Sequence, residues 1–325
     1  MTDTTDQFGA TADFPDDEYR PDDSASLGDP AQIGRYRIDR LLGRGGFGVV
    51  YLGFDESLNR DVAIKVPRPD VLQNEVSIDL YLAEARAVAN LNHANIVPVY
   101  DVGSTDEFPC FVVSRFIEGI TLSDKCQQSP LTFSQSAELV ATVADALHYG
   151  HTHGLVHRDI KPANIIIDES GKPYIVDYGL ALSDDRIGMG SRFAGTPYYM
   201  SPEQARGEGH RVDGRSDVFS LGVVLYRLLV GRAPFHGDTV PDILQHVVKY
   251  DPRPPRQIDD RIPRELERIC LKALSKRANA SLSGPSSSRP NPLSALNWST
   301  LSMMPPLMAS SMSSASCSSC NSLTQ

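Results

Sequence analysis

Hydrophobic and polar positions alternate in short runs between residues 36 and 116, with the two-residue period of half-buried β-strands. One stretch in this region, residues 76–91, instead places Leu80, Val88 and Leu91 on one side of a helix. Glycine-rich and polar turns separate the strand-like runs. The pattern predicts a small, sheet-rich lobe with one helix. Its strands are predicted at residues 36–42, 49–54, 61–66, 96–102 and 111–116.

Beyond Gly119 the pattern changes to that of helices. Residues 216–230 are apolar nearly all round, which predicts a buried helix. Further helices are predicted at residues 136–153, 239–250 and 263–276. The chain therefore predicts an α+β fold of two lobes. The β-rich lobe covers about residues 33–118, and a larger, mainly α-helical lobe covers about residues 119–277.

The two ends of the chain differ in composition from this central part. Residues 1–32 hold nine acids against one base, which predicts an acidic, disordered tail. Residues 278–325 are rich in serine, and from residue 281 onward Arg289 is the only charged residue. This second segment is predicted to be a low-complexity tail.

Charge and cysteine usage exclude several classes of protein. The formal net charge of −10 argues against nucleic acid as a partner, because phosphate backbones bind basic surfaces. The five cysteines are few and irregularly spaced, which indicates a reducing compartment, and we expect a cytoplasmic location. No apolar run reaches the roughly 18–20 residues of a membrane span.

A glycine-rich segment between two predicted strands is the first candidate site. Glycines let the backbone approach phosphate groups because no Cβ stands in the way. In a dinucleotide-binding fold such a segment lies between a strand and a helix, whereas here a strand follows a strand. The arrangement favours a hairpin that covers ATP. Its residues are Gly43, Gly45, Gly46, Phe47 and Gly48.

The next strand carries the sequence Val62-Ala63-Ile64-Lys65. A lysine ammonium there can neutralise the α- and β-phosphates of ATP. It needs an anion to hold it, and Glu84 on the following helix is the expected partner, with Glu75 as the alternative.

The most specific motif is His157-Arg158-Asp159-Ile160-Lys161-Pro162-Ala163-Asn164. Asp159 can accept the proton of a hydroxyl nucleophile, and Lys161 can offset charge on the transferring phosphoryl group. Asn164 offers a neutral oxygen to a metal ion. Asp177, in Asp177-Tyr178-Gly179, is a hard oxygen ligand suited to magnesium.

Taken together, these motifs resemble the bacterial eukaryotic-like (Hanks-type) serine/threonine protein kinases, in the order of that family, from about Tyr36 to Lys276. The resemblance implies a two-lobed protein kinase-like fold with ATP between the lobes, and Mg²⁺ as the metal with Mn²⁺ as an alternative. It implies that Val50, Ala63 and Ile166 enclose the adenine. It also implies a gatekeeper at Ser114 and a hinge from Arg115 to Ile117 whose backbone reads the adenine edge.

The family resemblance assigns roles to residues after the catalytic motif as well. Tyr178 replaces the usual phenylalanine and is expected to stack with Val88 and His157, while its hydroxyl needs a partner. Asp217 resembles the buried aspartate that holds the backbone of the catalytic loop. Lys161 and Thr196 fit the serine/threonine class.

Arg158, next to Asp159, suggests control by phosphorylation of the activation segment, because a phosphate there would pair with the guanidinium. The candidate acceptors are Ser183, Ser191 and Thr196, with Ser191 ranked first. Dimerisation for trans-autophosphorylation is a related expectation.

The resemblance fails near residue 281. Family members carry an arginine there that pairs with the glutamate corresponding to Glu203, whereas this chain has Ser281. Losing one partner of a buried ion pair costs about 3–5 kcal/mol, so a weakened, truncated helical lobe is expected unless Glu203 finds another cation, such as Arg277 or Arg206. A shifted reading frame, an unusual natural terminus and a functional serine-rich tail are the open explanations of the last segment.

The sequence as a whole predicts a serine/threonine protein kinase that transfers the γ-phosphate of ATP to serine or threonine hydroxyls of protein substrates in signalling. Two alternatives stay open: a pseudokinase-like scaffold that binds nucleotide without turnover, and a truncated kinase that does not fold stably. The presence of every catalytic residue counts against the scaffold.

Overall fold

The computed structural model describes residues 30–69, 72, 75–178 and 197–276, without the side chains of residues 75–77. The serine-rich tail and most of the acidic tail that the sequence predicts lie outside these residues. Gln32, expected at the end of the acidic tail, belongs instead to a two-residue strand, where it pairs with Arg37.

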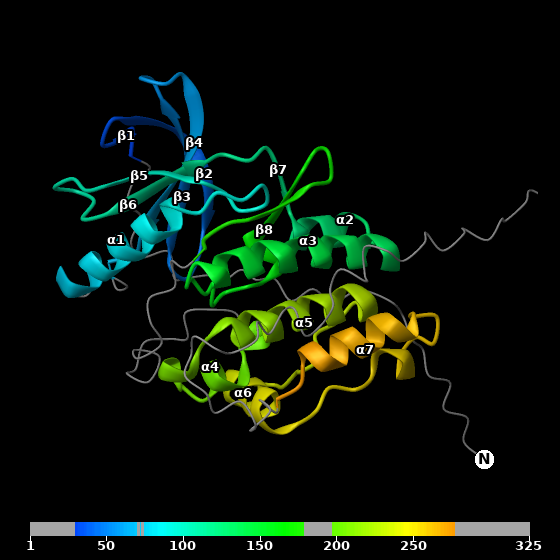
Figure 1. Ribbon diagram of the computed structural model, residues 1–325. Coiled ribbons are helices and arrows are strands. Elements are labelled where there is room, and N and C mark those ends of the chain that lie inside the picture. The colour runs from blue at the N-terminus through cyan, green and yellow to red at the C-terminus, as the bar shows by residue number, and fades with distance from the viewer. Residues whose placement is uncertain (1–29, 70–71, 73–74, 179–196, 277–325) are drawn as a thin grey trace, which may run out of the picture.

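The small lobe is built on one antiparallel sheet with the strand order β1-β2-β3-β4-β6-β5 (Figure 1). Alternating side chains make one face of this sheet apolar, and the cluster on that face includes Tyr51, Val62, Ile64 and Val113. The strands are β1 (Gln32–Ile33), β2 (Tyr36–Arg44), β3 (Gly48–Asp55), β4 (Arg60–Pro67), β5 (Val99–Gly103) and β6 (Phe111–Arg115).

Helix α1 (Glu75–Ala89) is the only helix among the described residues of the small lobe, and it packs beside β5. Tyr81 and Ala85 on this helix are buried against Cys110 and Val112 of the sheet region. This packing fixes the side of α1 that faces the lobe, and it leaves Leu80 48% exposed.

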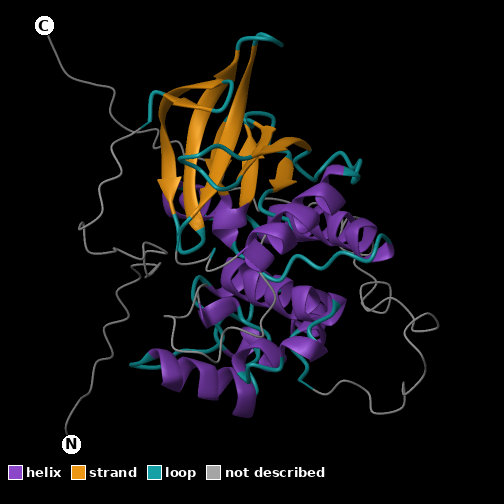
Figure 2. Cartoon of the chain, turned by 90° about the vertical axis from the view of Figure 1, so that its left-hand side faces the viewer, coloured by secondary structure: helices purple, strands orange, loops and turns teal. Residues whose placement is uncertain are grey.

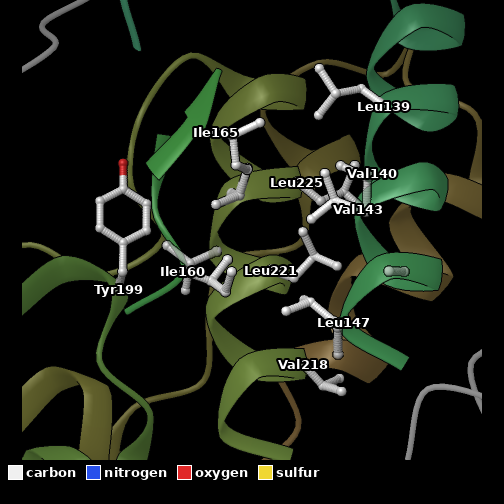
Figure 3. Packing of buried hydrophobic residues seen from close by; sticks show 14 of the residues in the cluster. Leu139, Val140, Val143, Leu147, Ile160, Ile165, Tyr199, Val218, Leu221 and Leu225 are labelled. Atoms are coloured by element: carbon white, nitrogen blue, oxygen red, sulfur yellow. The ribbon is translucent and has the colours of Figure 1, made fainter. Parts of the chain in front are cut away.

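The large lobe is helical and is centred on α5 (Gly214–Val230). Figure 3 shows Leu221 and Leu225 of α5 packed between Ile160 and Ile165 on one side and the residues of α3 on the other. Gly231 ends α5 at a φ of 81°, a conformation that favours glycine. The other helices are α2 (Leu122–Gln128), α3 (Phe133–Thr152), α4 (Pro202–Ala205), α6 (Val240–Lys249) and α7 (Arg264–Ala273).

A second, three-stranded sheet lies where the lobes meet. It has the order β7-β8-β9, from β7 (Gly119–Thr121), β8 (Ile165–Asp168) and β9 (Pro173–Ile175). Val97, which precedes β5, donates its N–H to the carbonyl of Ile175 at 3.0 Å, so the small lobe is hydrogen-bonded to this sheet. The β8–β9 hairpin brings Asn164 and Asp177 to the same end of the sheet.

The two-lobed α+β architecture expected from the sequence is confirmed, with strands above and helices below in Figure 2. Element ends differ from the predictions by a few residues, as they do at α3, which begins at Phe133 rather than residue 136. The sequence pattern missed β7, β8 and β9, because three or four residues are too few for a period to be recognised.

Candidate active site

The glycine-rich segment forms the turn of the β2–β3 hairpin, as the sequence predicts. The N–H of Gly45 donates to the carbonyl of Gly48 at 2.8 Å. Gly48 is required by the fold, because a Cβ there would lie 2.3 Å from the carbonyl oxygen of Val66. At Gly43, however, a Cβ would meet nothing within 4 Å. Packing does not explain the missing side chain at Gly43, whereas close approach of a ligand would.

The residues predicted to enclose adenine lie in both lobes and are apolar and at least partly buried. Val50, Ala63 and Ile166 are half-buried, and Ile117 is 6% exposed in one cluster with Ile166. Ser114 pairs with Ala63 across β4 and β6, and the N–H of Arg115 donates to Pro98. Residues predicted to surround adenine are thus placed on β3, β4, β8 and the strand that leads out of the small lobe.

Lys65 on β4 is a nearly buried ammonium, 8% exposed, and its Nζ lies 2.9 Å from Oδ2 of Asp177. The ring of Phe47, at the turn of the glycine-rich hairpin, lies 6.0 Å from the same Nζ. The ion pair therefore joins the sheet of the small lobe to the segment that follows β9.

Glu84 does not pair with Lys65, so the predicted partner of the lysine differs from the one in the structure. An Oε1 of Glu84 instead lies 3.4 Å from Nη1 of Arg158. The physical reason is that a buried ammonium pairs with the nearest anion, here Asp177, while the guanidinium of the catalytic loop reaches Glu84. The side chain of Glu75, the alternative partner, lies outside the described residues.

Burial raises the pKa of Glu84 from 4.5 to about 7, although the nearby guanidinium of Arg158 acts in the opposite direction. Its second carboxylate oxygen is buried without a hydrogen-bond partner among the described residues. Glu84 is therefore held loosely and is close to protonation at neutral pH.

The catalytic loop brings together Asp159, Lys161 and Asn164. The Nζ of Lys161 lies 3.1 Å from Oδ2 of Asp159, and the Nδ2 of Asn164 donates to the same oxygen at 2.9 Å. Burial alone would raise the pKa of Asp159, but Lys161, His157 and Asn164 together lower it below its ordinary value. Asp159 is thus a carboxylate that is ionised and held in one orientation.

The donor set near Asp177 fits a divalent cation such as Mg²⁺. The amide nitrogen of Asn164 donates to the backbone carbonyl of Asp159 at 2.8 Å and to the carboxylate of Asp159 at 2.9 Å. The amide oxygen of Asn164 therefore points away from Asp159. The carbonyl of Asn164 accepts from Val176 at 3.1 Å, which fixes Asn164 next to the residue before Asp177. A carboxylate and an amide oxygen are hard ligands of the kind magnesium binds.

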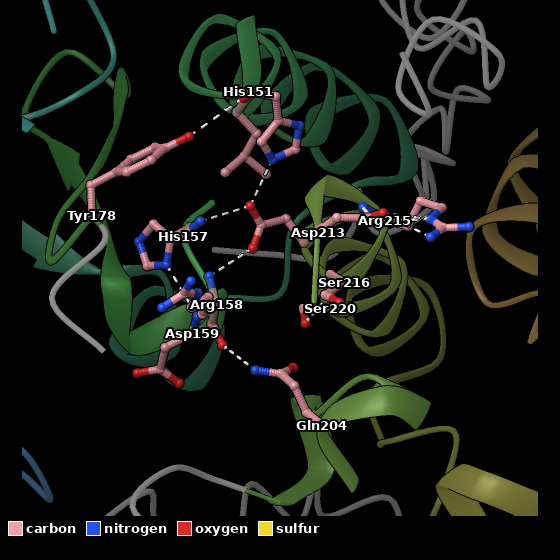
Figure 4. Close-up of polar contacts among 12 residues, drawn as sticks. His151, His157, Arg158, Asp159, Tyr178, Gln204, Asp213, Arg215, Ser216 and Ser220 are labelled. Atoms are coloured by element: carbon pink, nitrogen blue, oxygen red, sulfur yellow. Dashed lines mark hydrogen bonds and ion pairs between the residues drawn. The ribbon is translucent and has the colours of Figure 1, made fainter. Parts of the chain in front are cut away.

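Asp217, near the start of α5, holds the backbone of the catalytic loop, whose residues His157, Arg158 and Asp159 are labelled in Figure 4. It is fully buried, and its two oxygens accept from the N–H groups of His157 and Arg158, each at 2.8 Å. Arg158 has a φ of 70°, a left-handed conformation that is unfavourable for arginine. The hydrogen bonds to Asp217 stabilise this strained backbone immediately before Asp159.

Sequence reasoning missed His151 as a further partner of Asp217. Its Nε2 lies 2.7 Å from Oδ2 of Asp217, within hydrogen-bond distance. Nothing in the periodicity of the α3 segment distinguishes His151 from other buried positions on that helix.

Gln204 was missed as well, although its signal was readable in the sequence. Ser201-Pro202-Glu203-Gln204 forms a capping box at α4, and a capping box has the pattern serine-x-x-glutamine. The Nε2 of Gln204 also donates to the carbonyl of Arg158 at 2.8 Å. Arg158 is thereby hydrogen-bonded through both its N–H and its carbonyl.

Glu203, whose expected arginine partner is missing, accepts a hydrogen bond from Ser216 on α5. Glu203 is only partly buried, so the penalty of a fully buried unpaired charge does not apply. Ser281, where the arginine was expected, lies outside the described residues, as do Ser183, Ser191 and Thr196, the candidate phosphorylation sites.

Tyr178 is 2% exposed, and its ring lies edge-on to that of His157 with 5.0 Å between centroids. Its hydroxyl donates to the carbonyl of Leu147 at 3.4 Å, and burial raises its pKa far above the ordinary value. The stacking on His157 expected from the sequence is present, and Val88 belongs to the same apolar cluster.

Comparison with known families agrees with this geometry. A family profile described as the protein kinase domain matches residues 36–286. Serine/threonine-protein kinase PknB of Mycolicibacterium smegmatis is 40% identical over 250 residues, which cover 74% of this chain and 40% of that protein.

A DNA damage-responsive serine/threonine-protein kinase, RqkA of Deinococcus radiodurans, is 40% identical over 254 residues, or 76% of this chain and 37% of that protein. The chain therefore spans about two fifths of the length of these curated relatives. The crystal structure of the Mycobacterium tuberculosis PknI kinase domain superposes with a TM-score of 0.61 at 24% identity, covering 78% of this chain and 92% of that one. That likeness bears on the fold alone.

Proposed function

The chain belongs to the protein kinase domain family, and from that premise we propose that it transfers the γ-phosphate of ATP to serine or threonine hydroxyls of proteins. The observation that carries the proposal is the arrangement of Asp159, Lys161 and Asn164. In this arrangement the amide of Asn164 orients the carboxylate of Asp159, which would bind the substrate hydroxyl, and the ammonium of Lys161 lies beside it.

Asp159 acts on the nucleophile. The lowered pKa keeps it ionised, so its carboxylate accepts a hydrogen bond from the substrate hydroxyl and directs that oxygen toward the phosphorus. Lys161, 3.1 Å away, lies close enough to neutralise charge that develops on the transferring group. Positioning and charge stabilisation of this kind supply most of the catalysis in phosphoryl transfer.

The nucleotide would lie between the glycine-rich hairpin and the three-stranded sheet. The proposed adenine contacts are Val50, Ala63, Ile166 and the hinge from Arg115 to Ile117. Lys65 would hold the α- and β-phosphates. Asp177 and Asn164 would hold Mg²⁺, or Mn²⁺, and the metal would supply charge neutralisation on the phosphate oxygens.

Three cysteines in the described part of the chain, Cys110, Cys126 and Cys270, are free and buried. Burial raises the pKa of Cys110 and of Cys126 to about 11, so both remain protonated and unreactive at neutral pH. Free thiols of this kind support the proposed cytoplasmic location. Among the described residues, no helix has the length and apolar character to cross a bilayer.

Regulation by phosphorylation of the activation segment is a further part of the proposal. Arg158 is the residue that supports it, because its guanidinium pairs with Glu84 at the long distance of 3.4 Å and a phosphate would compete for it. Trans-autophosphorylation by a second copy of the chain remains a prediction.

A nucleotide-binding scaffold without turnover is the second candidate. The observation that favours it is the pairing of Lys65 with Asp177, which occupies two groups that catalysis needs. Transfer of phosphate separates the two candidates, because only the kinase turns over.

The test is incubation of the purified full chain with Mg²⁺ and γ-labelled ATP in the presence of casein as a generic acceptor. The proposal predicts label on phosphoserine and phosphothreonine, and loss of label in Asp159→Asn. Label on phosphotyrosine would contradict the assigned class, and equal labelling by Asp159→Asn would contradict the assigned site.

A further inference from the structure

Gly150 lies two residues before the end of α3, on the side of the helix that faces Tyr178. Its backbone is not in the left-handed region, so its conformation does not require glycine. A glycine within a helix is destabilising relative to alanine. Neither local backbone geometry nor helix stability explains why glycine occupies this position.

The neighbouring Tyr178 supplies the explanation. A Cβ on Gly150 would lie 1.8 Å from the hydroxyl oxygen of Tyr178, 2.4 Å from Cζ and 3.0 Å from Cε1. Figure 4 shows this hydroxyl directed at the helix that carries His151. The space left by the missing side chain of Gly150 is therefore filled by the hydroxyl end of the tyrosine.

The tyrosine ring cannot easily move away from such a contact. It is 2% exposed and packed edge-on against His157, and a tyrosine side chain has only two torsions with which to adjust. The hydrogen bond from its hydroxyl to Leu147 is long, at 3.4 Å, so shape rather than hydrogen bonding fixes the ring. A collision at Gly150 would be transmitted to the backbone of Tyr178.

That backbone continues directly into Asp177, whose φ of 58° is already in the left-handed region. Asp177 is the proposed metal residue and the partner of Lys65 at 2.9 Å. A shift of the tyrosine backbone by a fraction of an ångström would therefore move the carboxylate on which the nucleotide site depends.

We propose that Gly150 is a positioning residue, matched to the hydroxyl of Tyr178, which sets the place of Asp177 in the active site. The steric match stands on the geometry alone, whereas the effect on catalysis rests on the kinase activity proposed above. The pair explains how the buried site at position 178 holds the hydroxyl of a tyrosine, because Gly150 leaves the space that it fills.

The experiment places Gly150→Ala in three backgrounds: wild-type Tyr178, Tyr178→Phe and Tyr178→Leu. Phenylalanine removes the oxygen at 1.8 Å but keeps Cζ at 2.4 Å, and leucine stops short of both positions. Asp145→Ala, at an exposed position of the same helix, is the control for adding an alanine to α3. Each full-length variant is assayed for melting temperature without nucleotide or metal, and for kcat, the KM of ATP and the Mg²⁺ concentration at half-maximal rate.

We expect the effect of Gly150→Ala on stability and activity to depend on the side chain at position 178. Gly150→Ala lowers the melting temperature and reduces kcat by at least about tenfold beside Tyr178, less beside phenylalanine and least beside leucine. The Mg²⁺ requirement rises in the same order, while Asp145→Ala changes none of these values. An equal cost in all three backgrounds overturns the steric match.

A graded melting temperature with an ungraded kcat and Mg²⁺ requirement overturns the positioning role. If the wild-type chain transfers no phosphate at all, the proposed function fails, but the melting temperatures still test the match between Gly150 and Tyr178.

Discussion

Arg158 belongs to two regions of the molecule that are held in different ways. Its backbone lies in an anchored region, in which Asp217 and Gln204 bind its N–H and its carbonyl, each at 2.8 Å. Its side chain lies in a second region, beside the small lobe, where the guanidinium meets the loosely held Glu84 at 3.4 Å.

The two regions differ in burial as well as in the lengths of their contacts. Asp217 is fully buried, whereas the side chains of Arg158 and Glu84 are 25% and 27% exposed. Hydrogen bonds to a buried charge are costly to break, and long pairs near solvent contribute little. The comparison teaches that the backbone of the catalytic loop is held by short hydrogen bonds to a buried carboxylate, while the pair between Arg158 and Glu84 is longer and nearer to solvent.

The largest effect is expected for Asp217→Asn, which removes a carboxylate that holds the catalytic loop. The substitution replaces one carboxylate oxygen with an NH₂ group that faces a backbone N–H, so one buried donor loses its acceptor. We expect a loss of about 2–3 kcal/mol in the free energy of unfolding, together with a fall in kcat. The measurement is chemical denaturation alongside the phosphate-transfer assay.

Asp213→Asn, at the half-exposed N-cap of the same helix, is the control and should leave the denaturation midpoint nearly unchanged, because asparagine also caps helices well and the ion pair of Asp213 with Arg215 lies near solvent. Equal midpoints for Asp217→Asn and wild type would show that the anchored region does not depend on this carboxylate.

A smaller effect is expected for Ser216→Ala, which removes the hydroxyl that donates to Glu203. A hydrogen bond to a charged group contributes about 1.5–3 kcal/mol, and partial exposure of Glu203 places the expected loss near the lower end. Denaturation of the variant measures it. A loss above that range would show that Glu203 has no other support, as the missing arginine suggested.

The smallest effect is expected for the loosely held Glu84, whose protonation should make the stability of the fold depend on pH. Because burial raises its pKa to about 7, folded protein holds a proton there that the unfolded chain releases near pH 4.5. The contribution of Glu84 to stability is therefore present at low pH and is lost as the pH rises through about 7.

Glu84→Gln cannot release a proton, so the melting temperature of wild type minus that of the variant should fall by a few degrees from about pH 5 to about pH 8. Differential scanning calorimetry across that range measures the difference. A difference that stays constant or rises with pH would contradict the raised pKa.

Candidate residues could be chosen from the sequence, whereas their pairings could not. Gly43, Lys65, Asp159, Asn164 and Asp177 are candidates because each lies in a short motif whose residue types suit a chemical task, and their roles remain predictions. The structure joins Lys65 to Asp177 in an ion pair and Asn164 to Asp159 in a hydrogen bond.

Which anion lies beside Lys65 could not be predicted, because that depends on where α1 packs relative to the catalytic loop. Ser216 and His151 likewise acquire their partners only when α3, α4 and α5 assemble. Gly150 could have been noticed as a glycine within a helix, but its partner Tyr178 is 28 residues away in the sequence and only the fold brings them together.

The most direct test of the account measures ATP binding and phosphate transfer side by side in wild type and Asp159→Asn. Asp159 is not among the proposed adenine contacts, so isothermal titration calorimetry should give similar ATP affinities for both proteins. Transfer of label from γ-labelled ATP should fall by about 10²–10⁴-fold in the variant, the range expected for loss of a positioned general base. Undiminished transfer by Asp159→Asn, or no transfer by a wild-type chain that binds ATP, would contradict the account.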